Sequence, residues 1–179
     1  SGPKTASPPF DDPDADLIIR TSDGVDFRVY RVIMKQASPV FRSLFTLPLD
    51  DPANGSVVEV TEKSGVWDQI LRILYPITQK AVPAPNDFLP LLEAARKFDM
   101  ASVTEYVEQV MITPVVLETE AFRVFALSCV YVLPDAALAA AQASFQSWPG
   151  DQPPPPCIPE MHGMTITQYN RLLQYRSDC

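Results

Sequence analysis

The chain has 179 residues, which allows one ordinary domain and a smaller appendage, because domains usually span about 100 to 200 residues. Its composition, 46% hydrophobic and 20% charged, is that of a globular protein and excludes a chain that is disordered throughout. A net charge of −8 argues against nucleic acids and anionic membranes as partners, since both are bound mainly through Lys and Arg.

The sequence also contains no apolar run near the ~20 residues that span a bilayer. Three cysteines, Cys129, Cys157 and Cys179, are odd in number and lack the paired spacing of a zinc site or a disulfide scaffold. They are typical of free thiols in a reducing compartment, and the polar opening does not resemble a signal peptide. We therefore expect an intracellular protein, cytoplasmic or nuclear.

Residues 1–15 hold four prolines and few apolar side chains, which predicts a disordered lead-in. A β-hairpin is expected next. An apolar run at residues 17–19 precedes the Asp23-Gly24 pair, and apolar and polar residues alternate over 25–30. The Asp-Gly pair is typical of a type I′ turn between two strands.

A helix is predicted to begin at Ser38-Pro39, because a serine can cap a helix and proline suits the first helical position. A loop over 48–55 and a short strand over 56–60 follow. Three amphipathic helices come next, with apolar residues at helical spacing over 66–74, 88–95 and 103–111. Ser102 and Glu105 have the spacing of a capping box at the start of the third.

The rest of the chain is predicted to be helical. Residues 114–148 form a helical hairpin, whose second helix is expected to bury Leu138, Ala141 and Phe145. A Pro-rich linker is predicted over 149–164. Thr165 and Gln168 then open a C-terminal helix over 165–179.

The sequence offers little chemistry for catalysis. The single histidine, His162, stands in a loop bounded by Pro, Gly and Met, without a nucleophile placed beside it. The acidic run from Asp11 to Asp16 lacks the glycine and the glutamate of a calcium-binding loop. We therefore predict no enzyme activity, no catalytic residue, no metal site and no cofactor.

The order of these elements and several of their residues resemble the BTB/POZ domain. Residues 16–19, the Asp23-Gly24 pair and residues 27–34 look like its opening strand, turn and following segment. Residues 38–45 (SPVFRSLF) and 91–100 (LLEAARKFDM) are similar to two of its helices. The resemblance implies an α+β fold, a small mixed sheet with a cluster of helices, over 16–113. Residues 70–76, 122–126 and 169–176 are similar to BTB proteins of mushroom-forming (basidiomycete) fungi.

This resemblance implies a non-enzymatic protein–protein interaction module that acts as a scaffold or an oligomerisation domain. The alternative is a substrate adaptor of a ubiquitin ligase. Family members that bind a cullin scaffold often carry a hydrophobic-x-Glu motif after the Ser-capped helix. Here Leu49 and Asp51 align with it, with Asp in place of Glu, and Phe45 precedes them. The helical hairpin is placed like the helices that extend the cullin surface, although it could equally cover the end of the domain.

The resemblance also bears on self-association. Dimers that exchange elements in this family use an N-terminal helix and strand before the hairpin, and residues 1–15 contain too many prolines for that helix. The charged pair of the family's dimer pocket aligns with Asp16 and Arg31, which could instead form a local salt bridge. We expect a monomer or a weak homodimer.

Overall fold

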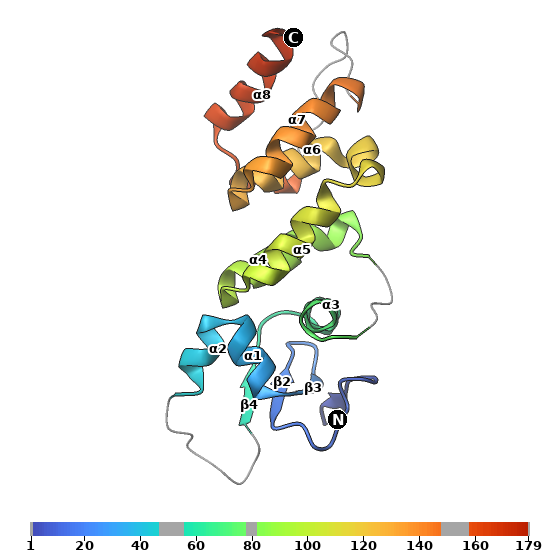
Figure 1. Ribbon diagram of the computed structural model, residues 1–179, viewed down its shortest axis with the longest axis vertical. Coiled ribbons are helices and arrows are strands. Elements are labelled where there is room, and N and C mark those ends of the chain that lie inside the picture. The colour runs from blue at the N-terminus through green and yellow to red at the C-terminus, as the bar shows by residue number, and fades with distance from the viewer. Residues whose placement is uncertain (1, 47–55, 78–81, 148–157, 179) are drawn as a thin grey trace. The chain divides into compact units, whose positions relative to one another are not determined.

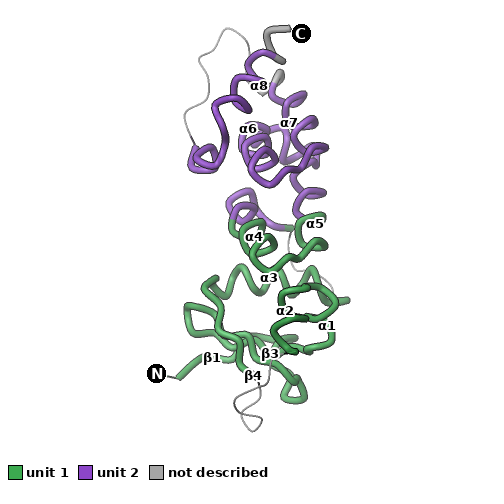
Figure 2. The backbone as a smooth tube through the Cα atoms, turned by 90° about the vertical axis from the view of Figure 1, so that its left-hand side faces the viewer, with its two compact units in different colours: residues 1–82, 90–105 green, residues 83–89, 106–179 purple. Residues whose placement is uncertain are grey.

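The computed structural model describes residues 2–46, 56–77, 82–147 and 158–178 (Figure 1). It divides into two compact units, coloured separately in Figure 2. The first contains residues 1–82 and 90–105, and the second contains residues 83–89 and 106–179.

The first unit contains a four-stranded mixed sheet in the order β1-β3-β2-β4. Strands β2 (Leu17–Arg20) and β3 (Val25–Val29) are antiparallel, with Leu17 opposite Val29. Strand β4 (Ser56–Glu59) runs parallel to β2. Alternate residues of the central hairpin point into the core, as a half-buried sheet requires, and the fully buried ones are Leu17, Ile19, Phe27 and Val29. The predicted strands and the α+β class are confirmed.

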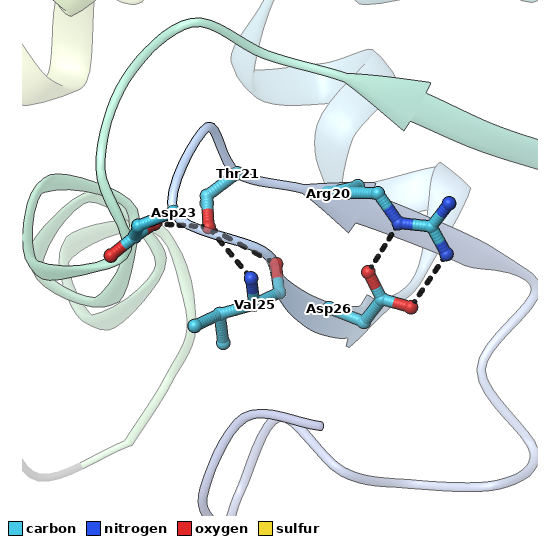
Figure 3. Close-up of polar contacts among 5 residues, drawn as sticks. All are labelled: Arg20, Thr21, Asp23, Val25 and Asp26. Atoms are coloured by element: carbon cyan, nitrogen blue, oxygen red, sulfur yellow. Dashed lines mark hydrogen bonds and ion pairs between the residues drawn. The ribbon is translucent and has the colours of Figure 1, made fainter. Parts of the chain in front are cut away.

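The turn between β2 and β3 differs from the predicted type I′ turn (Figure 3). Only Gly24 has positive φ, at 76°, while a type I′ turn needs positive φ at two central residues. The Gly24 N–H donates to the Thr21 carbonyl at 2.9 Å, and the Thr21 N–H donates to the Val25 carbonyl at 3.0 Å. These bonds are typical of a three-residue loop with a bulge at glycine. Below the loop, Arg20 and Asp26 form a two-bonded ion pair across the strands.

Asp23 in this turn also caps a helix. Its carboxylate accepts from the Thr21 hydroxyl at 2.6 Å, the Ser64 hydroxyl at 2.6 Å and the Ser64 N–H at 2.9 Å. Ser64 begins α3 (Ser64–Leu74), whose preceding residue, Lys63, makes no capping bond with its side chain. The hydrogen bonds from Ser64, and then that from Thr21, lower the pKa of Asp23 from 3.8 to about 2.

We expect Asp23→Ala to lower the free energy of unfolding by about 1 kcal/mol, as the loss of a helix cap does. Because the folded-state pKa is depressed, the stability from this group is complete above 3.8 and is lost as the pH falls toward about 2. The free energy of unfolding, measured with denaturant at several pH values in this range, should therefore change less with pH for Asp23→Ala than for the unmutated protein. If the free energy of unfolding depends on pH equally in the two proteins, Asp23 does not cap α3.

The predicted disordered lead-in over residues 1–15 is wrong, because this segment is packed on the sheet. Strand β1 (Lys4–Thr5) pairs in parallel with β3. The side chain of Phe10 is 0% exposed, and its carbonyl accepts from the Arg28 N–H at 2.9 Å. Asp12 accepts a hydrogen bond from the Tyr30 hydroxyl, which raises the pKa of Tyr30 to about 12. One buried aromatic and an edge strand thus order a stretch whose average composition predicts disorder.

Two short helices follow the hairpin, α1 (Arg31–Ala37) and α2 (Pro39–Leu44). The predicted start of α2 is confirmed, since the Ser38 hydroxyl accepts from the Phe41 N–H at 3.1 Å. The same hydroxyl donates to the carbonyl of Phe98. Phe41 packs in an aromatic cluster with Trp67 and Phe98, at ring-centroid distances of 6.1 Å and 5.4 Å.

Helices α4 (Pro85–Phe98) and α5 (Ala101–Met111) bury the predicted apolar stripes. On α3, Trp67 and Ile70 of the predicted stripe are buried, but so is Leu71, which lies outside it. The capping box predicted at Ser102 is wrong, because α5 begins one residue earlier. Asp99 adopts a left-handed conformation with φ of 52°, and the Met100 N–H returns to the Ala95 carbonyl at 2.8 Å. This C-terminal turn of α4 leads into the next helix at once, and the Met100 carbonyl accepts from the Val103 N–H.

The second unit contains the predicted helical hairpin, formed by α6 (Pro114–Tyr131) and α7 (Pro134–Ser147). Leu138 was predicted to be buried on α7, but it is 55% exposed. The buried face of α7 instead carries small side chains, Ala136, Ala140, Ala141 and Ser144. Phe145 has no described side chain. Small residues let two helices approach closely and leave the larger leucine outside.

Part of the predicted 149–164 linker is a short 3₁₀ helix, η1 (Pro159–Gly163), so the linker is wrong over these residues. Residues 148–157 lie outside the described part of the chain. The predicted cap of the last helix, α8 (Ile166–Asp178), is confirmed. The Thr165 hydroxyl accepts from the Gln168 N–H at 3.2 Å, and Gln168 Oε1 accepts from the Thr165 N–H at 2.8 Å.

Candidate functional site

The structure brings Asp16 and Arg31 together, as the sequence predicts, but through the main chain. The Arg31 N–H donates to Asp16 Oδ1 at 2.8 Å. Arg31 is the first residue of α1, and the residue before it, Tyr30, makes no capping bond with its side chain. The carboxylate of Asp16 therefore satisfies an open N–H at the start of the helix. Among the described contacts no ion pair joins the two side chains, so the alternative of a local salt bridge is not found.

The Arg31 guanidinium lies instead over an aromatic ring. Its Cζ is 4.9 Å from the ring centroid of Phe45, and Lys35 Nζ is 5.9 Å from the same centroid. Arg31 Nε is buried and has no hydrogen-bond acceptor among the described residues. A buried donor without an acceptor is costly, and the protein itself covers this Nε, so the face of the guanidinium and its charge are what Arg31 contributes here.

Phe45 connects the two sites that the sequence predicts separately. It was assigned to a groove for a cullin, whereas Arg31 was assigned to a dimer pocket, and the two side chains stack on each other. The ring of Phe45 is half-buried and also contacts Phe41, at 5.8 Å between centroids. Leu49 and Asp51 lie outside the described residues. Their place in a groove stays a prediction.

Helices α1 and α2 also expose large apolar side chains. Val32 is 60% exposed, Val40 43% and Leu44 37%. Single exposed apolar residues are common, but a group on two adjacent helices marks an interaction site more often. We call the group the α1–α2 surface, and its members are Arg31, Val32, Lys35, Val40, Leu44 and Phe45.

The α1–α2 surface is also positively charged in an acidic protein. Residues 31–45 contain Arg31, Lys35 and Arg42 and no Asp or Glu, whereas the whole chain has a net charge of −8. Arg42 Nε donates to the Lys35 carbonyl at 3.3 Å, which joins the two helices. Opposite charges on a partner would be attracted to such a surface and would help to orient it.

Most of this surface was missed because α1 was not predicted as a helix. Val32, Ile33 and Met34 form an apolar run directly after β3, and Val and Ile favour strands. A helical signal was present in the spacing of Ile33, Met34 and Ala37, which are the more buried positions of α1. In the helix, Val32 is 60% exposed.

The described residues contain no group of three His, Cys, Asp or Glu side chains that could hold a metal ion. The His162 ring is exposed, and its Nδ1 lies 2.8 Å from the Pro159 carbonyl. None of the helices described is long and apolar enough to cross a membrane.

The described structure combines a small mixed sheet with helices that expose apolar and cationic side chains. Comparison with protein families shows that residues 11–114 match the BTB/POZ domain. The chain belongs to the BTB/POZ family, whose domain is a protein–protein interaction module. The confirmed family extends about as far as the predicted 16–113. Strand β1 and Phe10 precede the matched residues.

Among solved structures, the chain is similar to the BTB domain of zebrafish PATZ1. The two are 26% identical, the match covers 54% of this chain and 75% of the zebrafish chain, and the TM-score is 0.43. No curated protein matches the chain. The resemblance to proteins of mushroom-forming fungi therefore stays a prediction.

Proposed function

We propose that this BTB domain binds its protein partner through the α1–α2 surface and acts as a scaffold that associates weakly with itself. The observation that carries the proposal is the group of exposed valines and leucine on α1 and α2, together with the Arg31–Phe45 stack. The apolar side chains provide area to bury, and Arg31 and Lys35 provide positive charge.

A second copy could supply the complementary charge. Asp11 and Asp14 are exposed near the start of the domain, and residues 31–45 contain no Asp or Glu. Attraction between exposed charges contributes little affinity, about 0 to 1 kcal/mol for each pair. Such contacts therefore favour a weak dimer over a stable one.

Light scattering over a range of concentrations tests this proposal. We expect a monomer at low micromolar concentration and a growing dimer fraction at about a hundredfold more. Val32→Glu should abolish the dimer, because it places a carboxylate in the apolar contact. The matched control is Val115→Glu, since Val115 is 77% exposed on α6. A stable dimer at low micromolar concentration, or equal effects of both variants, would contradict the proposal.

The alternative, a cullin adaptor, is supported by the position of the α6–α7 hairpin after the family domain. Calorimetry with a cullin N-terminal domain distinguishes the two functions. An adaptor should bind, and Leu49→Ala should weaken binding by about 2 kcal/mol if this leucine is a central anchor. Asp51→Ala should also weaken it. A scaffold that is not an adaptor should give no heat of binding in the same titration.

A further inference from the structure

A cavity of about 400 Å³ lies within the second unit, where the α6–α7 turn meets α8. This volume falls within the range of small-molecule sites, about 300 to 1,000 Å³. Its walls are mostly apolar and include Phe125, Leu133, Leu138 and Leu172. The exposed Leu138 that departs from the predicted stripe is thus part of this cavity.

Several contacts hold α8 in place as one wall. Gln168 Nε2 donates to the Cys129 carbonyl at 3.2 Å, and the ring of Tyr169 meets that of Phe122 edge-on at 6.3 Å. Glu160 of η1 lies 3.2 Å from Arg123 of α6. Leu172 is only 1% exposed. The cavity is therefore formed by packed helices.

The cavity has a positive charge at its edge. Among the described residues, Arg171 is the only charged one in the lining, and no described carboxylate pairs with its guanidinium. Arg171 is exposed, so its cation stands at the solvent side of an apolar cavity. This arrangement complements a molecule with an apolar body and a terminal carboxylate.

Backbone strain marks the same place. Val132 ends α6 in the left-handed conformation, with φ of 59°, where glycine is the usual residue. A β-branched side chain is unfavourable there. Val132 is also 81% exposed and lines the cavity. Strained residues concentrate at binding sites, and a bound apolar ligand would cover this one.

We propose that this cavity binds a small aliphatic carboxylic acid, with the alkyl chain among the apolar walls and the carboxylate at Arg171. The site is separate from the α1–α2 surface and does not depend on the function proposed there. A carboxylate and an exposed guanidinium attract each other modestly, so the apolar walls supply most of the affinity and Arg171 supplies the preference for an acid.

Calorimetric titration of the full chain with octanoate, and with octanol as the uncharged match, tests the proposal. Arg171→Gln should weaken octanoate binding about fivefold and leave octanol binding unchanged. Arg42→Gln, which removes an exposed arginine of the first unit, should change neither. Ala137→Phe should block both ligands, because Ala137 lines the cavity and the ring would fill it.

A further variant and a second measurement distinguish a loss of binding from a loss of folding. Val132→Gly should raise the melting temperature, because glycine adopts the left-handed conformation without strain. It should also weaken the binding of octanoate and of octanol, because it removes part of the apolar wall. Octanoate should also slow alkylation of Cys129, which lines the cavity, in a chain with Cys157→Ser and Cys179→Ser. No octanoate binding at millimolar concentration, or binding unaffected by Val132→Gly and Arg171→Gln, would overturn the proposal. Binding of an acidic amphipathic peptide without binding of octanoate would also overturn it.

Discussion

Phe10→Ala should lower the free energy of unfolding of the first unit by about 3 to 4 kcal/mol, the usual cost of truncating a buried phenylalanine. The ring is fully buried and lies 6.0 Å from that of Phe27 and 5.5 Å from that of Tyr75, between centroids. The Arg72 guanidinium lies over it, with Cζ 5.5 Å from the centroid. Removing the ring opens a cavity beneath β3. Denaturant unfolding with a constant m-value measures the loss.

The control for this prediction is a change in the same segment that leaves the core intact. Lys4→Ala alters an exposed residue of β1 and should change stability by less than about 0.5 kcal/mol. Phe10→Leu keeps most of the buried volume, so its loss in the free energy of unfolding should lie between those of Lys4→Ala and Phe10→Ala. If Phe10→Ala costs no more than Lys4→Ala, residues 1–15 are not packed on the sheet and the sequence-based expectation of a disordered lead-in is correct after all.

The parts of the fold that the sequence predicted are those set by local signals. The β2–β3 hairpin and the Ser38 cap each depend on residues close together in the chain. The error over residues 1–15 came from distant contacts. Composition predicts disorder for residues 1–15, but Phe10 is ordered by Phe27 and Tyr75, which lie far along the sequence. The average composition of a segment does not show that one aromatic ring within it is buried.

The candidate site was predicted only in part for the same reason. Motif alignment selected Asp16, Arg31 and Phe45, which the structure places in one cluster. It assigned them to two different surfaces, because alignment carries no information on which side chains stack. The cavity at α8 was not predicted at all. It follows from the outward turn of Leu138, and that turn depends on how closely the small residues of α7 pack.

The second large effect is expected at Phe41, because this residue joins the core to the α1–α2 surface. It is the only buried side chain of α2 within the described residues, and it is 1% exposed. Its ring contacts Trp67 and Phe98 on one side and Phe45 on the other. Phe41→Ala should cost about 3 to 5 kcal/mol and release α2. Denaturant unfolding measures the cost, and hydrogen exchange should show lost protection in α2.

Phe45→Ala is the matched change on the surface side of the same stack. Phe45 is half-buried, so its truncation should cost only about 1 to 2 kcal/mol, while removing the ring over which Arg31 lies. Phe45→Ala should therefore weaken self-association in a folded protein, whereas Phe41→Ala should weaken it by unfolding α2. If Phe45→Ala leaves self-association unchanged, the Arg31–Phe45 stack does not form the contact. If it costs as much stability as Phe41→Ala, the ring of Phe45 belongs to the core and not to a surface available for a partner.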